Sequence, residues 1–149
     1  MARSFCNLLY HIVFSTKDRE AWLTQHIRPK VEAYLGGAVN QEGGIPLVIG
    51  GMADHIHILA RLRQDKTIAD VLRSIKSNSS AWFRRTFRRS AFGWQLGYGA
   101  FTVSASQVAR VRKYVAEQER HHRGMSFQEE FVVLLRAHGM EFDERYLWT

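Results

Sequence analysis

The sequence predicts an α+β protein, a two-layer sandwich in which helices pack on an antiparallel sheet. Short apolar segments rich in β-branched and aromatic residues alternate with longer segments that have helical periodicity. Two of the short segments are separated by a brief Gly-rich turn, which is the pattern of an antiparallel hairpin. The 149 residues suit one domain with a buried core, and no linker or repeat divides residues 1–149.

The first three expected elements precede residue 50. Residues 5–16 predict a strand, and residues 19–23 a loop. A helix is expected from Thr24 or Pro29 to Gln41, because proline is tolerated only in the first helical turn. Residues 45–49, after the helix-breaking QEGG, predict a short buried strand.

The next three elements follow the turn GGMAD. Residues 55–61 predict the second strand of the hairpin. Thr67 is expected to cap a helix that reaches Phe87, with Asp70 three residues after the cap. The apolar stripe of this helix consists of Ile68, Val71, Leu72, Ile75, Trp82 and Phe83. Residues 93–99 predict a loop, and residues 100–106 a fourth strand.

Two helices are expected after the fourth strand. The first begins at Ser104 or Ser106 and ends near Gly124, with three valines on one stripe. The second begins at a capping box of Ser126 and Glu129 and closes at Gly139. The first six elements match the split βαβ, ferredoxin-like arrangement, to which these two helices are added.

Charge and composition favour a polyanionic partner in a reducing compartment. The formal net charge is +7, which is typical of proteins that bind nucleic acid. Cys6 is the only cysteine, which excludes a disulfide framework and a multi-cysteine zinc site. No apolar run is long enough to span a bilayer, and the N-terminus predicts a strand and not a signal peptide. The expected location is the cytoplasm, in association with the nucleoid.

His55 and His57 stand one residue apart in the apolar run MADHIHILA. Side chains alternate along a strand, so both imidazoles are expected on one face, with Ile56 and Ile58 on the other. Two adjacent imidazoles can bind a metal ion or a phosphate. They can equally be half-exposed histidines on an open sheet face, which the three-residue motif alone favours.

The segment VRKYVAEQERHH contains further candidates. Tyr114 and Gln118 are four residues apart, and therefore lie on one face of a helix. His121 and His122 follow one turn later on the same side. Each has an ordinary structural interpretation: an amphipathic tyrosine with its hydroxyl in water, a solvated glutamine, and histidines that favour the negative end of the helix dipole.

The second predicted helix has a basic face. Arg73, Lys76, Arg84 and Arg88 gather on the side opposite the apolar stripe, and no acid follows Asp70 before Arg89. A face of one sign favours a surface that binds phosphates, with Lys76 nearest the DNA, over a merely solubilising face. Three aromatic residues near the following loop are expected to serve packing: Trp94, Tyr98 and Phe101.

Taken together, these blocks resemble the HUH single-tyrosine transposases of the insertion sequence 200/605 group, which are close to the REP-associated tyrosine transposases. The resemblance is carried by DHIHIL on a strand and by a YxxxQ helix after a ferredoxin-like core. It extends to YHIVFSTKDRE, DKTIADVLRSIKSNSSAW, WQLGYGAFTVS and HHRGMSFQEEFVVLLRAHGMEFDERYLW, and so covers nearly the whole chain.

The resemblance implies metal-dependent cleavage and rejoining of single-stranded DNA. It assigns His55, His57 and Gln118 as ligands of a divalent metal and Tyr114 as the nucleophile. The tyrosine would form a 5′-phosphotyrosine, and a free 3′-hydroxyl would reverse the step. A phenol, with a pKa near 10, suits a reversible intermediate of this kind. Because ligating histidines must be deprotonated, activity should fall at acid pH.

The resemblance also implies Mg²⁺ or Mn²⁺, although imidazole ligands alone suggest zinc, nickel or copper. It implies a homodimer, in which the tyrosine acts in cis or in trans, and recognition of a DNA hairpin at the ends of the element. His121 and His122 are possible auxiliary residues. Tyr146 is a second possible nucleophile, but no glutamine follows it four residues later.

Two other functions remain open on the sequence. One is a nuclease of the replication-initiator or relaxase type, with the same chemistry but no helicase domain in this short chain. The other is a non-catalytic nucleic-acid-binding module with a ferredoxin-like sheet. Such modules usually carry aromatic residues on the open sheet face, where this chain carries two histidines.

Overall fold

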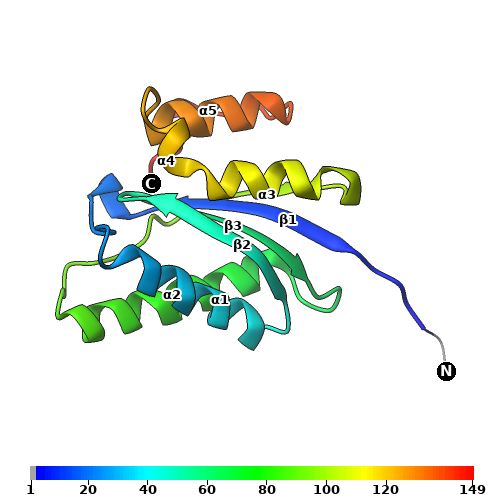
Figure 1. Cartoon of the computed structure of the whole chain (residues 1–149), viewed down its shortest axis with the longest axis horizontal. Helices are drawn as coiled ribbons and strands as arrows, with labels where there is room; N and C mark the ends of the chain where they lie inside the picture. The colour runs from blue at the N-terminus through cyan, green and yellow to red at the C-terminus, as the bar shows by residue number, and fades with distance from the viewer. Residues whose placement is uncertain (1–2) are drawn as a thin grey trace.

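The computed structural model describes residues 3–149 and contains a four-stranded antiparallel sheet with helices on both faces (Figure 1). The spatial strand order is β2-β3-β1-β4. The strands are β1 (Leu8–Ser15), β2 (Ile45–Met52), β3 (His55–Leu62) and β4 (Gly99–Thr102). Every neighbouring pair is antiparallel. The predicted split βαβ topology is therefore confirmed.

The helices form one layer on each side of the sheet (Figure 1). Helices α1 (Arg28–Gln41) and α2 (Ile68–Phe87) cover one face. Helices α3 (Val108–Ala116), α4 (Gln118–His121) and α5 (Phe127–Ala137) cover the other. Three short 3-10 turns occupy Lys17–Arg19, Ala105–Gln107 and Glu144–Tyr146. Helices α3, α4 and α5 thus add a third layer to the predicted two-layer core.

Strand alternation divides the interior into two cores. The larger core lies between the sheet and helices α1 and α2, and includes Phe14, Ile56 and Ile58. The smaller core lies between the sheet and α5, and includes Val13 and Phe131. Strand β3 is covered on both faces because it is central in the sheet, which explains why nearly all of its residues are buried.

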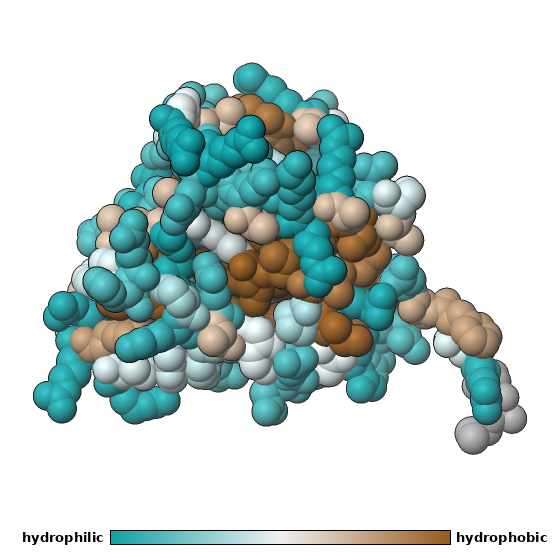
Figure 2. Space-filling model, in the orientation of Figure 1, coloured by the Kyte–Doolittle hydropathy of each residue, from teal (hydrophilic) through white to brown (hydrophobic). Residues whose placement is uncertain are grey.

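In the orientation of Figure 1, the molecular surface over the helices is largely hydrophilic (Figure 2). Apolar side chains gather at the centre of this face, between the upper and lower helices. Strand β2 is an edge of the sheet, and its Ile45 is 49% exposed. The helical layers therefore leave part of the sheet edge uncovered.

Helix ends follow the expected local signals. The Thr67 side chain accepts a hydrogen bond from the Asp70 backbone N–H, and α2 ends at Phe87 as predicted. Ser126 and Glu129 form the predicted capping box of α5, an arrangement that typically contributes about 1 kcal/mol. Gly139, with φ +65°, follows the end of α5. The capping box fixes where the buried face of α5 begins.

Several predicted boundaries were wrong. Strand β1 is shorter than the predicted 5–16, β2 extends three residues beyond Ile49, and β4 ends at Thr102. The expected continuous helix from Ser104 or Ser106 to Gly124 is instead a 3-10 turn followed by α3 and α4. The break falls at Glu117, whose φ and ψ are −102° and 32°. The local sequence contains no glycine or proline there, so helix periodicity alone does not predict the break.

Helix α3 approaches the sheet closely at Gly50. A Cβ atom at this position would lie 2.3 Å from the carbonyl oxygen of Val115, which no side chain could accommodate without a shift. Gly50 is the cross-strand neighbour of His57. The missing side chain at Gly50 therefore lets the helix that carries Tyr114 lie directly over the histidine strand.

Candidate metal centre and tyrosine nucleophile

His55 and His57 project from β3 toward the layer formed by α3, α4 and α5. Both side chains are fully buried, with 0% exposure. His55 Nε2 lies 3.0 Å from Gln118 Oε1, and His57 Nε2 lies 2.9 Å from Glu130 Oε1. The predicted shared face of the two imidazoles is confirmed. The interpretation as half-exposed histidines on an open sheet was wrong, because the C-terminal helices cover that face.

Tyr114 lies on α3 beside this pair. Its hydroxyl donates a hydrogen bond to Glu130 Oε2. Its ring centroid lies 5.8 Å from that of His57 and 6.0 Å from that of His11. The half-buried Tyr114 does lie at a boundary, but its hydroxyl is bonded to a buried carboxylate, so the interpretation that placed this hydroxyl in water was wrong.

Gln118 reaches the histidines because the helix breaks before it. Its side chain is 2% exposed, which excludes a solvated glutamine. Its Oε1 contacts His55 Nε2 and also His122 Nε2, at 3.1 Å. Its Nε2 donates to the Tyr114 backbone carbonyl at 3.3 Å. The break at Glu117 thus directs the carboxamide oxygen toward the imidazoles.

His121 and His122 have different positions. His122 joins the cluster, because its Nε2 lies 3.0 Å from Glu130 Oε1. His121 stacks against the Tyr114 ring, with ring centroids 4.5 Å apart. Within residues 3–149, its Nε2 is buried without a hydrogen-bond partner. Neither ring is a simple helix cap.

Glu130 is the central residue that the sequence analysis missed. Its side chain is buried, and its two oxygens contact His57, His122 and Tyr114. A signal for it exists in the sequence. Glu130 occupies the apolar stripe of α5 between Phe127 and Phe131, where a solvated acid is not expected.

Two groups behind the imidazoles were also missed. His55 Nδ1 lies 2.7 Å from Asp54 Oδ1, and His57 Nδ1 lies 2.8 Å from His11 Nε2. Partners of this kind fix the orientation of a ligating imidazole and decide which nitrogen carries the proton. Asp54 immediately precedes the motif, whereas His11 comes from β1 and is brought close only by strand pairing.

The pKa values of the two acidic groups in the cluster are shifted in opposite directions. Burial, with the hydrogen bond to Glu130, raises the pKa of the Tyr114 phenol above its usual range. Burial also favours a protonated Glu130, but hydrogen bonds from His122 and His55 outweigh it and hold the pKa of that carboxyl far below its usual range. The cluster therefore pairs a protonated phenol with an ionised carboxylate at neutral pH.

The pKa values of the two strand imidazoles are shifted in opposite directions. Burial lowers the pKa of His57 to about 4. Burial would also lower the pKa of His55, but hydrogen bonds to Asp54 and Glu130 outweigh it and raise the value to about 9. A cation that bound His55 would have to displace a proton below that pH, so metal affinity should rise as the pH approaches 9.

A cleft of about 700 Å³ opens beside Tyr114. Residues of α3 and α5 line it, together with His11 and the segment after β4. Arg110, one turn before Tyr114 on α3, is exposed in this lining. The cleft gives a ligand access to the tyrosine, and the Arg110 guanidinium provides a positive charge at the wall of the cleft.

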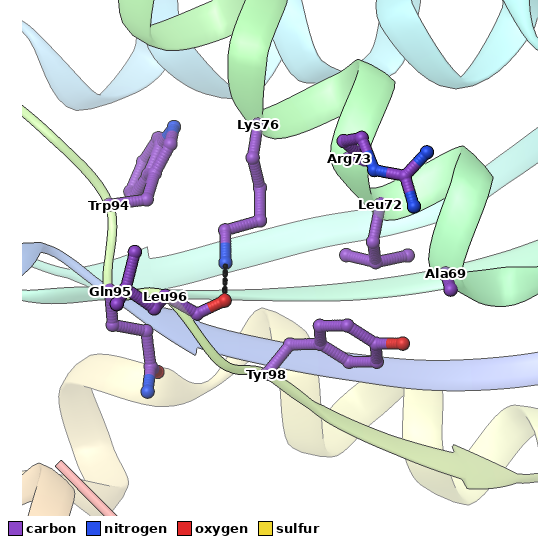
Figure 3. Close-up of a pocket in the computed structure, with 8 residues that line it drawn as sticks. All are labelled: Ala69, Leu72, Arg73, Lys76, Trp94, Gln95, Leu96 and Tyr98. Carbon is purple, nitrogen blue, oxygen red and sulfur yellow. Dashed lines mark hydrogen bonds between the residues drawn. The ribbon is translucent and has the colours of Figure 1, made fainter. Parts of the chain in front are cut away.

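The predicted basic face of α2 lies on the other side of the sheet. Arg73 and Lys76 line a pocket of about 390 Å³ with the loop that precedes β4 (Figure 3). Figure 3 shows the Lys76 chain extended toward this loop, where its Nζ donates to the Gly97 carbonyl at 2.8 Å and the Leu96 carbonyl at 3.2 Å. Burial lowers the pKa of Lys76 to about 8. Lys76 therefore already holds the loop in place.

The remaining residues near α2 have mixed positions. Arg84 donates to the Phe92 carbonyl at 3.1 Å, and Arg88 lies just beyond the helix in the left-handed region. Trp94 and Phe101 are buried, as expected for packing residues, while Tyr98 is 37% exposed beside the pocket (Figure 3). Arg73 pairs with the exposed Asp70 at 3.0 Å and keeps its guanidinium at the pocket mouth.

Comparison with known families decides the class of the protein. A family model described as "Transposase IS200 like" matches residues 4–118. The chain belongs to this family. It is a transposase of the insertion sequence 200/605 group. The family match favours this function over an initiator-type nuclease or a non-catalytic nucleic-acid-binding module.

Individual relatives agree with this assignment. This transposase is 26% identical to the ISDra2 transposase TnpA of Deinococcus radiodurans over 120 residues, 74% of this chain and 84% of that protein. A solved structure assigned as a transposase of D. radiodurans R1 has a TM-score of 0.64 and 22% identity, covering 79% of this chain and 96% of that one. A REP-associated tyrosine transposase bound to a REP hairpin has a TM-score of 0.58 and 12% identity, covering 78% and 70%.

The family match includes part of the cluster only. His55, His57, Tyr114 and Gln118 lie within the matched residues, whereas His122 and Glu130 lie beyond them. No helix of the described residues has the length and apolar character needed to cross a membrane.

Proposed function

We propose that this transposase cuts and rejoins single-stranded DNA through Tyr114, with a divalent metal held by His55, His57 and Gln118. The observation that carries the proposal is the meeting of nucleophile and ligands in one cluster. The Tyr114 hydroxyl bonds Glu130, whose other oxygen lies 2.9 Å from His57 Nε2. All these groups come from a single chain.

The residues fit a metal ion. His55, His122 and Glu130 offer ligand atoms within 4.8 Å of one another, and the Gln118 oxygen lies 3.0 Å from His55 Nε2. A bound Mg²⁺ or Mn²⁺ would polarise the scissile phosphate and neutralise charge in the transition state. The mixture of imidazole and oxygen donors favours Mn²⁺ of these two.

The chain's own groups account for the covalent step. The Tyr114 oxygen bonds to phosphorus, the bond from phosphorus to the 3′-oxygen breaks, and the 3′-oxygen leaves as a hydroxyl after it gains a proton. The Tyr114 proton faces Glu130 Oε2, which is placed to accept it. Attack by another 3′-hydroxyl reverses the step, so strands are rejoined without ATP.

A wild-type cleavage assay tests this function. Labelled single-stranded DNA hairpins, incubated with the protein and Mn²⁺, should give a denaturant-resistant protein–DNA adduct and also joined strands. Chelation with EDTA should remove both products, because the phosphate is then no longer polarised. Adduct formation of equal yield in EDTA would contradict the metal requirement, and the absence of any adduct on hairpin substrates would contradict the function.

DNA binding is proposed to involve Arg73, Lys76, Arg84 and Arg88. The REP-associated relative bound to a REP hairpin supports a hairpin partner. Arg73 is the best placed of the four, because its guanidinium stays exposed at the mouth of the pocket in Figure 3. Lys76 would act from within the pocket, over the Phe14 and Tyr98 rings.

Replacing Arg73 with alanine should weaken hairpin binding and lower the slope of log affinity against log salt by about one, as expected for one lost phosphate contact. Fluorescence anisotropy at several salt concentrations measures both quantities. Arg63→Ala is a matched control, because Arg63 is also exposed and paired with a nearby carboxylate, Asp65. Equal slopes for the two variants would remove Arg73 from the DNA-binding surface.

The homodimer remains a prediction, and we propose that the tyrosine acts in cis. The Tyr114 hydroxyl and the His57 imidazole of one chain contact the same Glu130 carboxylate. This shared contact within one chain is the observation behind the proposal.

A further inference from the structure

We propose that Glu130 and His122 are metal ligands, so that the C-terminal segment beyond the family match completes the metal centre. This inference rests on the proposed function, in which His55, His57 and Gln118 are the ligands. It adds a carboxylate and a third imidazole to that set. The helix α5 then becomes part of the metal-binding unit and not only a cover for the sheet.

The first support is geometric. Glu130 Oε1 lies 2.9 Å from His57 Nε2, 3.0 Å from His122 Nε2 and 3.4 Å from His55 Nε2. Ligand atoms bonded to one ion at about 2.0–2.2 Å are roughly 3.0–3.6 Å apart in octahedral or tetrahedral arrangements. The separations around Glu130 Oε1 lie at or close to the lower part of this range, so one shared ion fits them with little movement, as does a set of hydrogen bonds.

The second support is the position of protons on His122. Its Nδ1 lies 2.6 Å from the Met125 carbonyl oxygen, which can only accept, so Nδ1 carries a proton. In the neutral ring, Nε2 then has a lone pair. Nε2 itself faces two acceptors, Gln118 Oε1 at 3.1 Å and Glu130 Oε1 at 3.0 Å, so either a second proton or a bound cation must stand between this nitrogen and those oxygens.

The same arrangement recurs at His55. Its Nδ1 faces the Asp54 carboxylate at 2.7 Å, and its Nε2 faces Gln118 Oε1 at 3.0 Å. The Gln118 amide nitrogen is committed to the Tyr114 carbonyl, so the oxygen is the atom that faces the ring. At both rings the nitrogen that faces the cluster points at oxygen acceptors in a buried space. A proton holds this place in the metal-free protein, and a shared cation would replace it.

The carboxylate also links this centre to the nucleophile. Glu130 Oε1 faces the imidazoles while Oε2 accepts the Tyr114 hydroxyl. One buried side chain would therefore bind the ion and hold the phenol oxygen next to it. The competing interpretation is a metal-free cluster, in which extra protons on His55 and His122 pair with Glu130.

Direct metal binding separates these two interpretations. Mn²⁺ binding is measured by titration calorimetry and by EPR, and Co²⁺ binding by its visible absorption, on the full chain without DNA. Glu130→Gln keeps the size of the side chain and removes its charge, and should weaken Mn²⁺ binding at least tenfold. His122→Gln should do the same, and both should alter the Co²⁺ spectrum.

Matched controls make the result specific. Glu141→Gln removes an exposed carboxylate from the tail and should leave binding and spectrum as in the wild type. Circular dichroism in EDTA checks that each variant folds. If Glu130→Gln fails to fold, His122→Gln carries the test, because it retains the Glu130 carboxylate.

The outcomes distinguish this inference from the proposed function. Wild-type affinity and an unchanged Co²⁺ spectrum in Glu130→Gln and His122→Gln, together with weak binding in His55→Ala, would overturn the inference and leave the proposed ligands intact. Absence of Mn²⁺ and Co²⁺ binding in the wild type would overturn both metal assignments and support the metal-free cluster.

Discussion

We expect that replacing Tyr114 with phenylalanine abolishes the covalent protein–DNA adduct. The change removes one oxygen atom, the proposed nucleophile, and leaves the ring that stacks on His121. Cleavage should fall by at least about a thousandfold, because no other group replaces a lost covalent nucleophile. Quantitative gel electrophoresis of labelled hairpin DNA under denaturing conditions measures the adduct.

DNA binding should survive this substitution, since the hydroxyl bonds Glu130 within the protein. The free energy of unfolding should decrease by about 1–3 kcal/mol, because the buried carboxylate loses a donor. Tyr146→Phe is the matched control, because Tyr146 is 69% exposed in the tail. An adduct that persists in Tyr114→Phe and disappears in Tyr146→Phe would reverse the assignment of the nucleophile.

Replacing His57 with alanine should reduce metal-dependent cleavage by at least about a hundredfold at a fixed, low Mn²⁺ concentration. The substitution removes one proposed ligand from a site where the side chain is fully buried, and it leaves His11 without its partner. Higher Mn²⁺ should restore part of the activity if the loss lies in metal affinity. Cleavage rates over a series of Mn²⁺ concentrations measure this shift.

His26→Ala is the control for the loss of an imidazole, because His26 is exposed and outside the cluster. Mixing His57→Ala with Tyr114→Phe tests the cis arrangement. The mixture should remain inactive, because each chain then lacks one of two groups that meet in the same chain. Restored cleavage would show that the tyrosine acts on the metal site of a second copy. Equal Mn²⁺ dependence of His57→Ala and wild type would remove His57 from the ligands.

The local sequence determined much of the fold. Thr67 and Ser126 specify the starts of α2 and α5, since their caps depend on residues three positions away. The alternation of His55, Ile56, His57 and Ile58 is sufficient to place both imidazoles on one face of a strand. The resemblance of the YxxxQ segment to the transposase family identified Tyr114 and Gln118 as candidate site residues.

Only the tertiary structure decided how the site closes. Glu130 is 73 residues from His57, and their contact depends on α5 packing over the sheet. His11 meets His57 through the pairing of β1 with β3. The helix break at Glu117 has no glycine or proline to predict it, and it accompanies the contact of the buried Gln118 with His55. Residue spacing predicts which face of a strand or helix a side chain occupies. The residue that it contacts on that face comes from a distant segment of the chain, so spacing alone cannot identify that contact.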